Sequence, residues 1–376
     1  MAGLVIENLS KRFPSAHGQS SVSAIQDLSL ETRDGELLVI VGPSGSGKTT
    51  LLRLIAGLES ADKGGIHLQD RRIDRLPPEE RNVTMVFQGG ALHPHMTVRE
   101  NLASGLKWRG SPPGTIAEKV ESIAGSLGLL PMLDRLPEAL SGGERQRVAL
   151  GRSAVLSPDL FLLDEPLAHV DAGLRHQLRH EIRNLNRALG TALIHITHDQ
   201  AEAMSLGDRV AVMRHGTIQQ IGPPAEIYDE PANTFVAQFF GSRPMNLMEG
   251  TLLAADGSLH LQRRDGAPPT RLSLPSNPLW TALHGRDVLL GLRPETFSIL
   301  PPREEPLPDS TNTFKDSIRF SEFSGDAQYV TSGSGLLIRA EPNRECSPGA
   351  AIHVHADTTR ASLFSPGSGE RIASRG

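Results

Sequence analysis

The chain has 376 residues, of which 38% are hydrophobic and 22% are charged, which excludes a wholly disordered protein and predicts more than one domain. Its 38 Lys and Arg residues against 43 Asp and Glu residues give a net charge of −5, so nothing in the charge favours a nucleic-acid-binding protein. The single cysteine, Cys346, excludes an intramolecular disulfide and a cysteine-rich zinc site.

No apolar run approaches the roughly 18 residues that a membrane-spanning helix needs. The first residues also lack the basic segment and apolar segment of an export signal. We therefore expect a cytoplasmic protein unless other proteins hold it at a membrane.

Short apolar runs alternate with amphipathic stretches through the first two thirds of the chain, a pattern typical of an α/β domain. Residues 37–41, 160–163 and 192–196 are continuous apolar runs and predict buried strands. Helical spacing predicts two helices, each followed by a glycine suited to a C-cap: residues 48–56 before Gly57, and residues 173–188 before Gly190.

The composition changes twice along the chain. Residues about 89–150 are richer in Gly, Pro and helix formers, which predicts a helical insertion within the α/β domain. After residue 240, short apolar segments separated by Gly, Pro, Asp and Asn predict a small all-β barrel of the OB type. We therefore predict an α/β domain over residues 1–240 and a β-barrel domain over residues 241–376, with a stiff proline-rich connector at 301–308 and a fraying tail from residue 365.

A glycine-rich segment between the first predicted strand and the first predicted helix fits the P-loop pattern. Glycines let successive backbone N–H groups point at phosphate oxygens, and the helix N-terminus adds a partial positive charge. Lys48 is suited to bridge the terminal phosphates, and the Thr49 hydroxyl to ligate Mg²⁺. The alternative is a glycine-rich turn that only caps a helix. The predicted nucleotide-binding residues are Gly42, Pro43, Ser44, Gly45, Ser46, Gly47, Lys48, Thr49 and Thr50.

Two carboxylates end the second apolar strand, in the segment Phe161-Leu162-Leu163-Asp164-Glu165. An unpaired buried charge costs several kcal/mol, so acids at the end of a buried strand indicate a function. Asp164 is suited to the Mg²⁺ shell, and Glu165 is suited to accept the proton of an attacking water as a general base. The alternative is a solvated strand end.

Two further motifs surround this strand. Leu140-Ser141-Gly142-Gly143-Glu144 precedes it, and Ile196-Thr197-His198-Asp199 follows it. With these motifs the sequence resembles the ATP-binding subunit of an ABC transporter, because six motifs occur in the order of that family. The order is the P-loop, Gln88, the Ser-Gly-Gly signature, Asp164-Glu165, Asp171 and His198.

The resemblance assigns roles that the residues alone would not. It implies that Phe13 stacks on adenine, that Gln88 senses Mg²⁺ and the γ-phosphate, and that His198 contacts the γ-phosphate. Taken singly, these residues would be an ordinary core Phe, a surface Gln and a loop His. The loop that begins at Gln88 would face a membrane partner.

The resemblance also implies a dimer of two ATP-binding subunits. The signature begins a helix whose glycines allow a phosphate to come close, and in this family it meets the ATP held by the other subunit's P-loop. The residues expected to act across the dimer are Ser141, Gly142, Gly143, Glu144 and Asp171.

Three segments depart from the family pattern. Glu144 stands where Gln is usual, and Ser141-x-x-Glu144 is also a capping box that would tighten the helix start. Gly89-Gly90 replaces a bulkier pair, which affects the shape of the membrane-facing groove. Ala168-His169-Val170 replaces the usual residues before Asp171, which affects hydrogen bonds between subunits.

The last third of the chain resembles that of the maltose-type importer ATPases, whose relatives serve sugars and sn-glycerol 3-phosphate. Its matching segments are Gly241-Ser242-Arg243-Pro244-Met245-Asn246 and Leu290-Gly291-Leu292-Arg293-Pro294-Glu295. This implies an importer ATPase at the cytoplasmic face of the membrane, working with ATP, Mg²⁺, a second ATPase subunit, two permease subunits and an extracytoplasmic solute-binding protein. Two alternatives are a polyamine, iron or sulfate importer and a soluble ABC ATPase.

Overall fold

The computed structural model describes residues 2–14, 21–87, 91–168, 170–255, 258–301 and 312–372. The chain divides into two compact units, Met1–Pro224 and Ala225–Gly376. This division comes before the expected boundary at residue 240. The reason is Arg293, whose buried guanidinium donates to the carbonyl oxygens of Tyr228, Ala237 and Phe240, so that the segment carrying them packs within the second unit.

A mixed sheet with the strand order β10-β9-β3-β8-β7-β6 lies at the centre of the N-terminal unit. Its strands β3 (Leu37–Val41), β7 (Leu160–Asp164) and β8 (Ala192–Thr197) run parallel, and all their residues are buried. All three strands were predicted from their continuous apolar runs. The remaining strands are β6 (Val83–Val86), β9 (Arg209–Arg214) and β10 (Thr217–Gly222).

The helix α1 (Lys48–Ala56) follows β3, while α5 (Ala172–Leu189) connects β7 to β8 and α6 (Gln200–Leu206) connects β8 to β9. The two predicted C-caps are confirmed, because Gly57 and Gly190 have φ angles of 81° and 65°. Only glycine adopts this left-handed conformation without strain. Among the described residues, no helix is long and apolar enough to cross a membrane.

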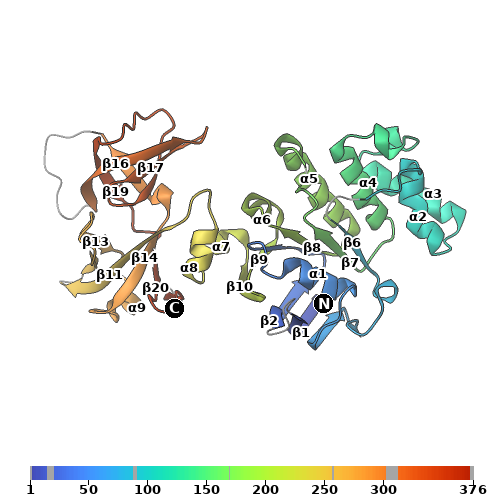
Figure 1. Ribbon diagram of the computed structural model, residues 1–376, viewed down its shortest axis with the longest axis horizontal. Coiled ribbons are helices and arrows are strands. Elements are labelled where there is room, and N and C mark those ends of the chain that lie inside the picture. Colours follow the sequence, from blue (N-terminus) through green and yellow to red (C-terminus); the bar gives the residue numbers. More distant parts are fainter. Residues whose placement is uncertain are drawn as a thin grey trace. The chain divides into compact units, whose positions relative to one another are not determined.

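The segment expected to be a helical insertion contains α2 (Val98–Trp108), α3 (Pro113–Ser126) and α4 (Gly142–Ala154). Figure 1 shows these helices side by side in the N-terminal unit. They share their own apolar core, which includes Leu102, Val120 and Val148. Three short 3-10 helices complete the unit's helical elements in the described ranges: Pro78–Glu80, Leu130–Met132 and Pro137–Ala139.

A second, antiparallel sheet in this unit was not predicted. Its strand order is β2-β1-β4-β5. Its buried apolar residues share one core with those of α1. Its strands are β1 (Ala2–Pro14), β2 (Ser21–Arg33), β4 (Lys63–Leu68) and β5 (Arg71–Arg72).

The C-terminal unit begins with two short helices and continues as two antiparallel sheets (Figure 1). The two sheets agree with the predicted all-β domain. Its apolar core includes Leu261, Leu290, Val330 and Val354. The helices are α7 (Pro224–Asp229), α8 (Thr234–Phe239) and α9 (Pro278–Thr281), with a 3-10 turn at Pro294–Thr296.

One sheet of this unit has the order β13-β12-β11-β14-β20-β21, and the other has the order β15-β19-β16-β17-β18. The first contains β11 (Asn246–Ala255), β12 (Ser258–Arg263), β13 (Arg271–Leu274), β14 (Asp287–Leu292), β20 (Ser362–Phe364) and β21 (Arg371–Ile372). The second contains β15 (Phe297–Leu300), β16 (Thr313–Phe323), β17 (Gln328–Ser332), β18 (Leu337–Ala340) and β19 (Ala351–Ala356).

The expectation of a fraying tail from residue 365 was wrong as far as residue 372. Ser365 N–H donates to the Glu370 carbonyl oxygen, and β21 then pairs with β20. The proline-rich connector lies outside the described residues except for Pro301.

Candidate functional site

The P-loop follows β3 directly and ends at α1. Gly47 is the N-cap of α1 with a φ angle of 103°, a conformation that L side chains rarely adopt. A side chain at Gly42 would also be excluded, because its Cβ would lie 2.1 Å from the Met213 carbonyl oxygen. Both glycines are therefore required by the fold of the loop.

The Lys48 side chain folds back over the loop. Its Nζ donates to the carbonyl oxygens of Gly42 and Pro43 over 2.7 Å and 3.0 Å. Burial lowers the pKa of Lys48, and the charges of Glu165 and Asp164 oppose this shift. These carbonyl oxygens hold the ammonium group at the loop. A bound phosphate could accept hydrogen bonds from it in their place or in addition to them.

Two polar side chains from neighbouring elements converge beside Lys48. The Thr49 hydroxyl lies 3.4 Å from Asp164 Oδ1, which brings the start of α1 to the end of β7. Burial raises the pKa of Asp164, and the nearby Glu165 charge raises it further. Hydroxyl and carboxylate oxygens are the ligands that Mg²⁺ prefers, so these two residues fit a Mg²⁺ site.

The next residue, Glu165, has a left-handed backbone with a φ angle of 45°. Such a conformation costs about 1 kcal/mol or more in a residue other than glycine and is enriched at functional sites. Glu165 N–H donates to the Ile196 carbonyl oxygen over 3.1 Å, and Glu165 Oε2 lies 3.1 Å from His198 Nδ1. The ends of β7 and β8 thus bring a carboxylate and an imidazole together.

These residues surround an open cavity of about 530 Å³, within the ~300–1,000 Å³ typical of small-molecule sites. Ser46 Oγ is buried there without a hydrogen-bond partner among the described residues, as expected for a hydroxyl that forms a hydrogen bond with a ligand. β2 forms part of the cavity wall. This part was not predicted, because the strand itself was not predicted from the sequence. The lining residues are Val22, Ser23, Ala24, Ser44, Gly45, Ser46, Gly47, Lys48, Thr49, Thr50, Glu165 and His198.

Phe13 is not among the lining residues, but it lies close to them. It pairs across the sheet with Val22, an exposed residue of the cavity wall. Its ring lies under Lys11, with Nζ 5.1 Å from the ring centroid, a cation–π contact. Gln88, which was expected beside the γ-phosphate, lies outside the described residues, as do Gly89, Gly90 and His169.

The signature motif begins α4 and does not line this cavity. Ser141 is the N-cap, and the predicted capping box is confirmed: Ser141 N–H donates to Glu144 Oε2 over 2.7 Å, and Glu144 N–H donates to Ser141 Oγ over 3.3 Å. The hydrogen bond from the Ser141 backbone lowers the pKa of Glu144. Glu144 is therefore occupied in its own helix cap.

The two signature glycines differ in their surroundings. A Cβ at Gly143 would lie 2.2 Å from the Leu174 side chain, so this glycine is needed for packing on α5. A Cβ at Gly142 would meet nothing within 4 Å, so its surface is open to an approaching group. Asp171 is the N-cap of α5, is exposed, and makes no side-chain cap hydrogen bond.

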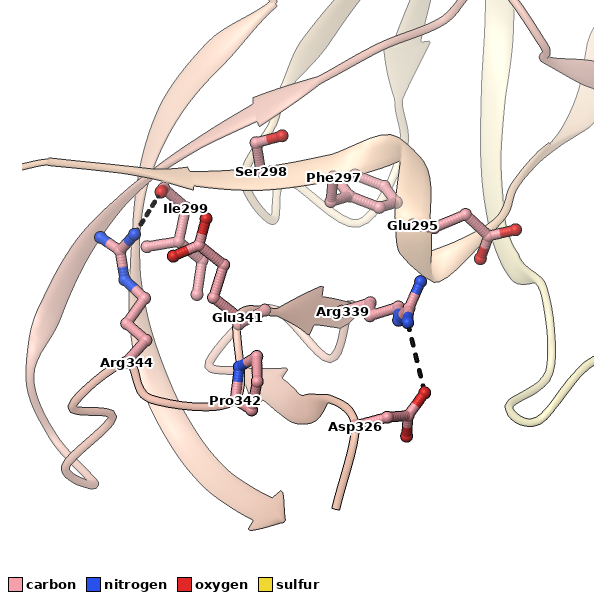
Figure 2. A pocket seen from close by; sticks show the side chains of 10 residues that line it. Glu295, Phe297, Ser298, Ile299, Asp326, Arg339, Glu341, Pro342 and Arg344 are labelled. Atoms are coloured by element: carbon pink, nitrogen blue, oxygen red, sulfur yellow. Dashed lines mark hydrogen bonds and ion pairs between the residues drawn. The ribbon is translucent and has the colours of Figure 1, made fainter. Parts of the chain in front are cut away.

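A second pocket, of about 350 Å³, lies in the C-terminal unit (Figure 2). Arg339 lies 3.5 Å from Asp326, and Arg344 donates to the carbonyl oxygens of Ile299 and Leu300. Its arginines are thus already engaged within the unit. None of the predicted site residues lines this pocket.

Comparisons with known proteins place the chain among ABC transporter proteins. Residues 25–168 match the family model described as ABC transporter. The chain is 41% identical over 382 residues to the sn-glycerol-3-phosphate import ATP-binding protein of Cupriavidus necator, covering 99% of this chain and 100% of that protein. It is 43% identical over 376 residues to the protein of that name from Chromobacterium violaceum, covering 99% of this chain and 96% of the relative.

A solved structure supports the same conclusion for the fold. The chain is similar to an ATP-binding cassette described as dimeric, in a post-hydrolysis state and bound to ADP and Pi, with a TM-score of 0.52 and 26% identity. The match covers 59% of this chain and 98% of that cassette.

Proposed function

Because the chain belongs to the ATP-binding subunits of ABC transporters, we propose that it is the ATPase of an importer for sn-glycerol 3-phosphate or a related carbohydrate. The observation that carries the solute assignment is the similarity over 99% of the chain to proteins of that activity. The maltose-like segments at Arg293-Pro294-Glu295 support the broader carbohydrate class.

Each group of residues around the cavity would have a distinct role in ATP hydrolysis. The P-loop amides and Lys48 would hold the phosphates, and Thr49 and Asp164 would hold Mg²⁺, which would neutralise phosphate charge. Glu165 would accept the proton of the attacking water, with His198 beside it at the γ-phosphate. Phe13 would approach adenine from β1, next to Val22, and Gln88 would complete the γ-phosphate site.

A second copy of the chain would complete this site. The open surface at Gly142 and the exposed Asp171 support a contact with nucleotide held by the partner. The working unit would then be an ATPase dimer under two permease subunits, at the cytoplasmic face of the membrane, receiving solute from an extracytoplasmic binding protein.

Uptake by cells tests the solute. Deletion of this chain should abolish uptake of labelled sn-glycerol 3-phosphate, and the parental chain should restore it, whereas the Lys48→Ala variant should not. Uptake of maltose, a polyamine, iron and sulfate is measured in parallel. Loss of one of these in place of sn-glycerol 3-phosphate would show that the solute is wrong while leaving the ATPase assignment intact.

Asp164→Asn should make the nucleotide-free protein more stable and less active. The pKa of Asp164 is higher in the folded chain than in the unfolded chain, so the folded state loses stability as the pH rises through these values. Above the raised pKa the ionised carboxylate carries the full loss, and a neutral amide removes it. We expect a gain of about 1 kcal/mol, or roughly 2–4 °C in Tm, by analogy with other functional-site substitutions.

The same variant should lose most of the Mg²⁺-dependent part of ATP binding, because it lacks the carboxylate. Thermal melts at pH 5 and pH 8, with and without Mg-ATP, measure both effects. If Asp164→Asn melts below the parental protein at pH 8 without nucleotide, the buried Asp164 charge does not destabilise the folded chain.

A further inference from the structure

A buried ionisable pair lies next to the candidate site and outside its cavity. His195 on β8 is completely buried, and the Glu202 side chain on α6 is 5% exposed. His195 Nε2 lies 3.2 Å from Glu202 Oε2. Neither residue lines the cavity, so nucleotide contact does not explain the pair.

The hydrogen bonds define the state of the pair. Burial acts to raise the pKa of Glu202, but hydrogen bonds from His195 and Thr197 outweigh it and hold the pKa below its ordinary value. Glu202 is therefore a carboxylate acceptor, and His195 donates from Nε2. His195 Nδ1 is buried without a hydrogen-bond partner among the described residues, so within that part of the chain the ring is oriented by its contact with Glu202.

Such a pair is a poor device for stability alone. Desolvation of buried ionised groups costs several kcal/mol, and well-packed apolar residues of similar volume are often at least as stable. Its value lies in fixing one geometry, because a hydrogen bond to a buried carboxylate permits few alternatives. The pair can fix the geometry of His198, which lies in the turn between β8 and α6.

Both backbone neighbours of His198 are tied to Glu202. The Thr197 hydroxyl bonds to Glu202 and accepts the Asp199 backbone N–H over 3.0 Å. Asp199 Oδ1 in turn accepts the Glu202 backbone N–H over 3.1 Å. The strand end and the helix start are thus joined in two ways: Asp199 caps α6 through the Glu202 backbone N–H, and the buried Glu202 carboxylate contacts His195 of β8.

His198 itself has little packing to hold it. Its side chain is 62% exposed, and it contacts Glu165 over 3.1 Å. Its position must therefore come mainly from the backbone on either side of it.

We propose that His195 and Glu202 are positioning residues that hold His198 against Glu165 for ATP hydrolysis. This inference rests on the proposed roles of Glu165 and His198. The imidazole of His195 acts through Glu202 on the β8–α6 turn and does not touch the nucleotide.

Two substitutions of His195 separate the hydrogen bond from the packing. His195→Leu fills similar space without a donor, and His195→Gln keeps an N–H donor at a similar reach. In the full-length chain, His195→Leu should lower kcat for ATP about tenfold or more, because small misplacements of reacting groups have large effects on rate. The KM for ATP should change less than about twofold, since the P-loop is untouched, and His195→Gln should recover most of kcat. If His195→Leu does not fold, His195→Phe tests the same loss of the donor with a ring of closer shape.

A double-mutant cycle with His198→Ala identifies the route of the effect. In the His198→Ala background, His195→Leu should cause no further loss of kcat, because the residue that it positions is gone. An equal loss in both backgrounds, or a KM that rises as kcat falls, overturns the positioning role. If His198→Ala alone hydrolyses ATP at the parental rate, the proposed role of His198 fails; if it is impaired while His195→Leu is normal, only the positioning pair fails.

Discussion

Glu165→Gln should lower ATP turnover by about 10²–10⁴-fold, the usual contribution of general-base catalysis. The amide keeps the size of the side chain but cannot accept the proton of the attacking water. Lys48, Thr49 and Asp164 are unchanged, so Mg-ATP should still bind. Turnover and nucleotide binding are measured on the same preparation.

The same variant should accumulate as an ATP-bound dimer. With hydrolysis blocked, ATP would remain between each P-loop and the Gly142 surface of the other copy. Light scattering should show a shift from monomer to dimer on addition of Mg-ATP. If isolated subunits associate too weakly, the complete transporter should remain closed instead.

Ser141→Arg is the matched control for this dimer. An arginine at the N-cap of α4 removes the Ser141 hydroxyl and places a bulky side chain beside the open Gly142 surface. It should abolish the ATP-dependent dimer of Glu165→Gln without affecting ATP binding to one subunit. Hydrolysis at the parental rate in Glu165→Gln would mean that the base is another residue, and a dimer that survives Ser141→Arg would argue against the shared site.

The central sheet and the glycine-rich loop before α1 could be predicted because their signals are local. β3, β7 and β8 are continuous apolar runs, since they are buried on both faces. The P-loop glycines and the capping box at Ser141 are fixed by spacing within a few residues. The roles of Phe13, Gln88, Asp171 and His198 came only from the family resemblance, and the roles of all the site residues remain predictions.

The antiparallel sheet of the N-terminal unit was missed because its pattern is interrupted. β2 alternates buried and exposed residues only in its second half, and β1 and β2 change register several times. Asn8 and Asp27 also have positive φ angles, at 48° and 46°. As a result, the cavity wall at residues 22–24 could not be recognised from the sequence.

The pair of His195 and Glu202 could not be predicted for another reason. His195 lies within an apolar strand and Glu202 within a polar helix start, so neither is unusual in its own segment. Only the packing of α6 against β8 brings the imidazole to the carboxylate. Pairings that depend on tertiary contacts leave no periodic signal along a chain.

Lys48→Ala should reduce ATP turnover by at least about 10²–10³-fold, the usual effect of removing one charge-stabilising donor from a catalytic site. The ammonium group is the cation of the P-loop, and it is placed by the carbonyl oxygens of Gly42 and Pro43 at the mouth of the loop. Without it, the terminal phosphates lose a charge-assisted hydrogen bond, so binding of ATP should weaken more than binding of ADP.

Lys48→Met separates charge from bulk, because methionine fills much of the same space without a positive charge. Both variants should fold, since burial already disfavours the Lys48 charge in the nucleotide-free protein. Both should lose turnover to a similar extent if the charge is what matters. Thermal melts establish folding, and turnover is then compared at saturating Mg-ATP. If a folded Lys48→Ala variant hydrolyses ATP at the parental rate, the P-loop has no role in hydrolysis. If only Lys48→Met retains activity, Lys48 supports the loop by packing and not by charge.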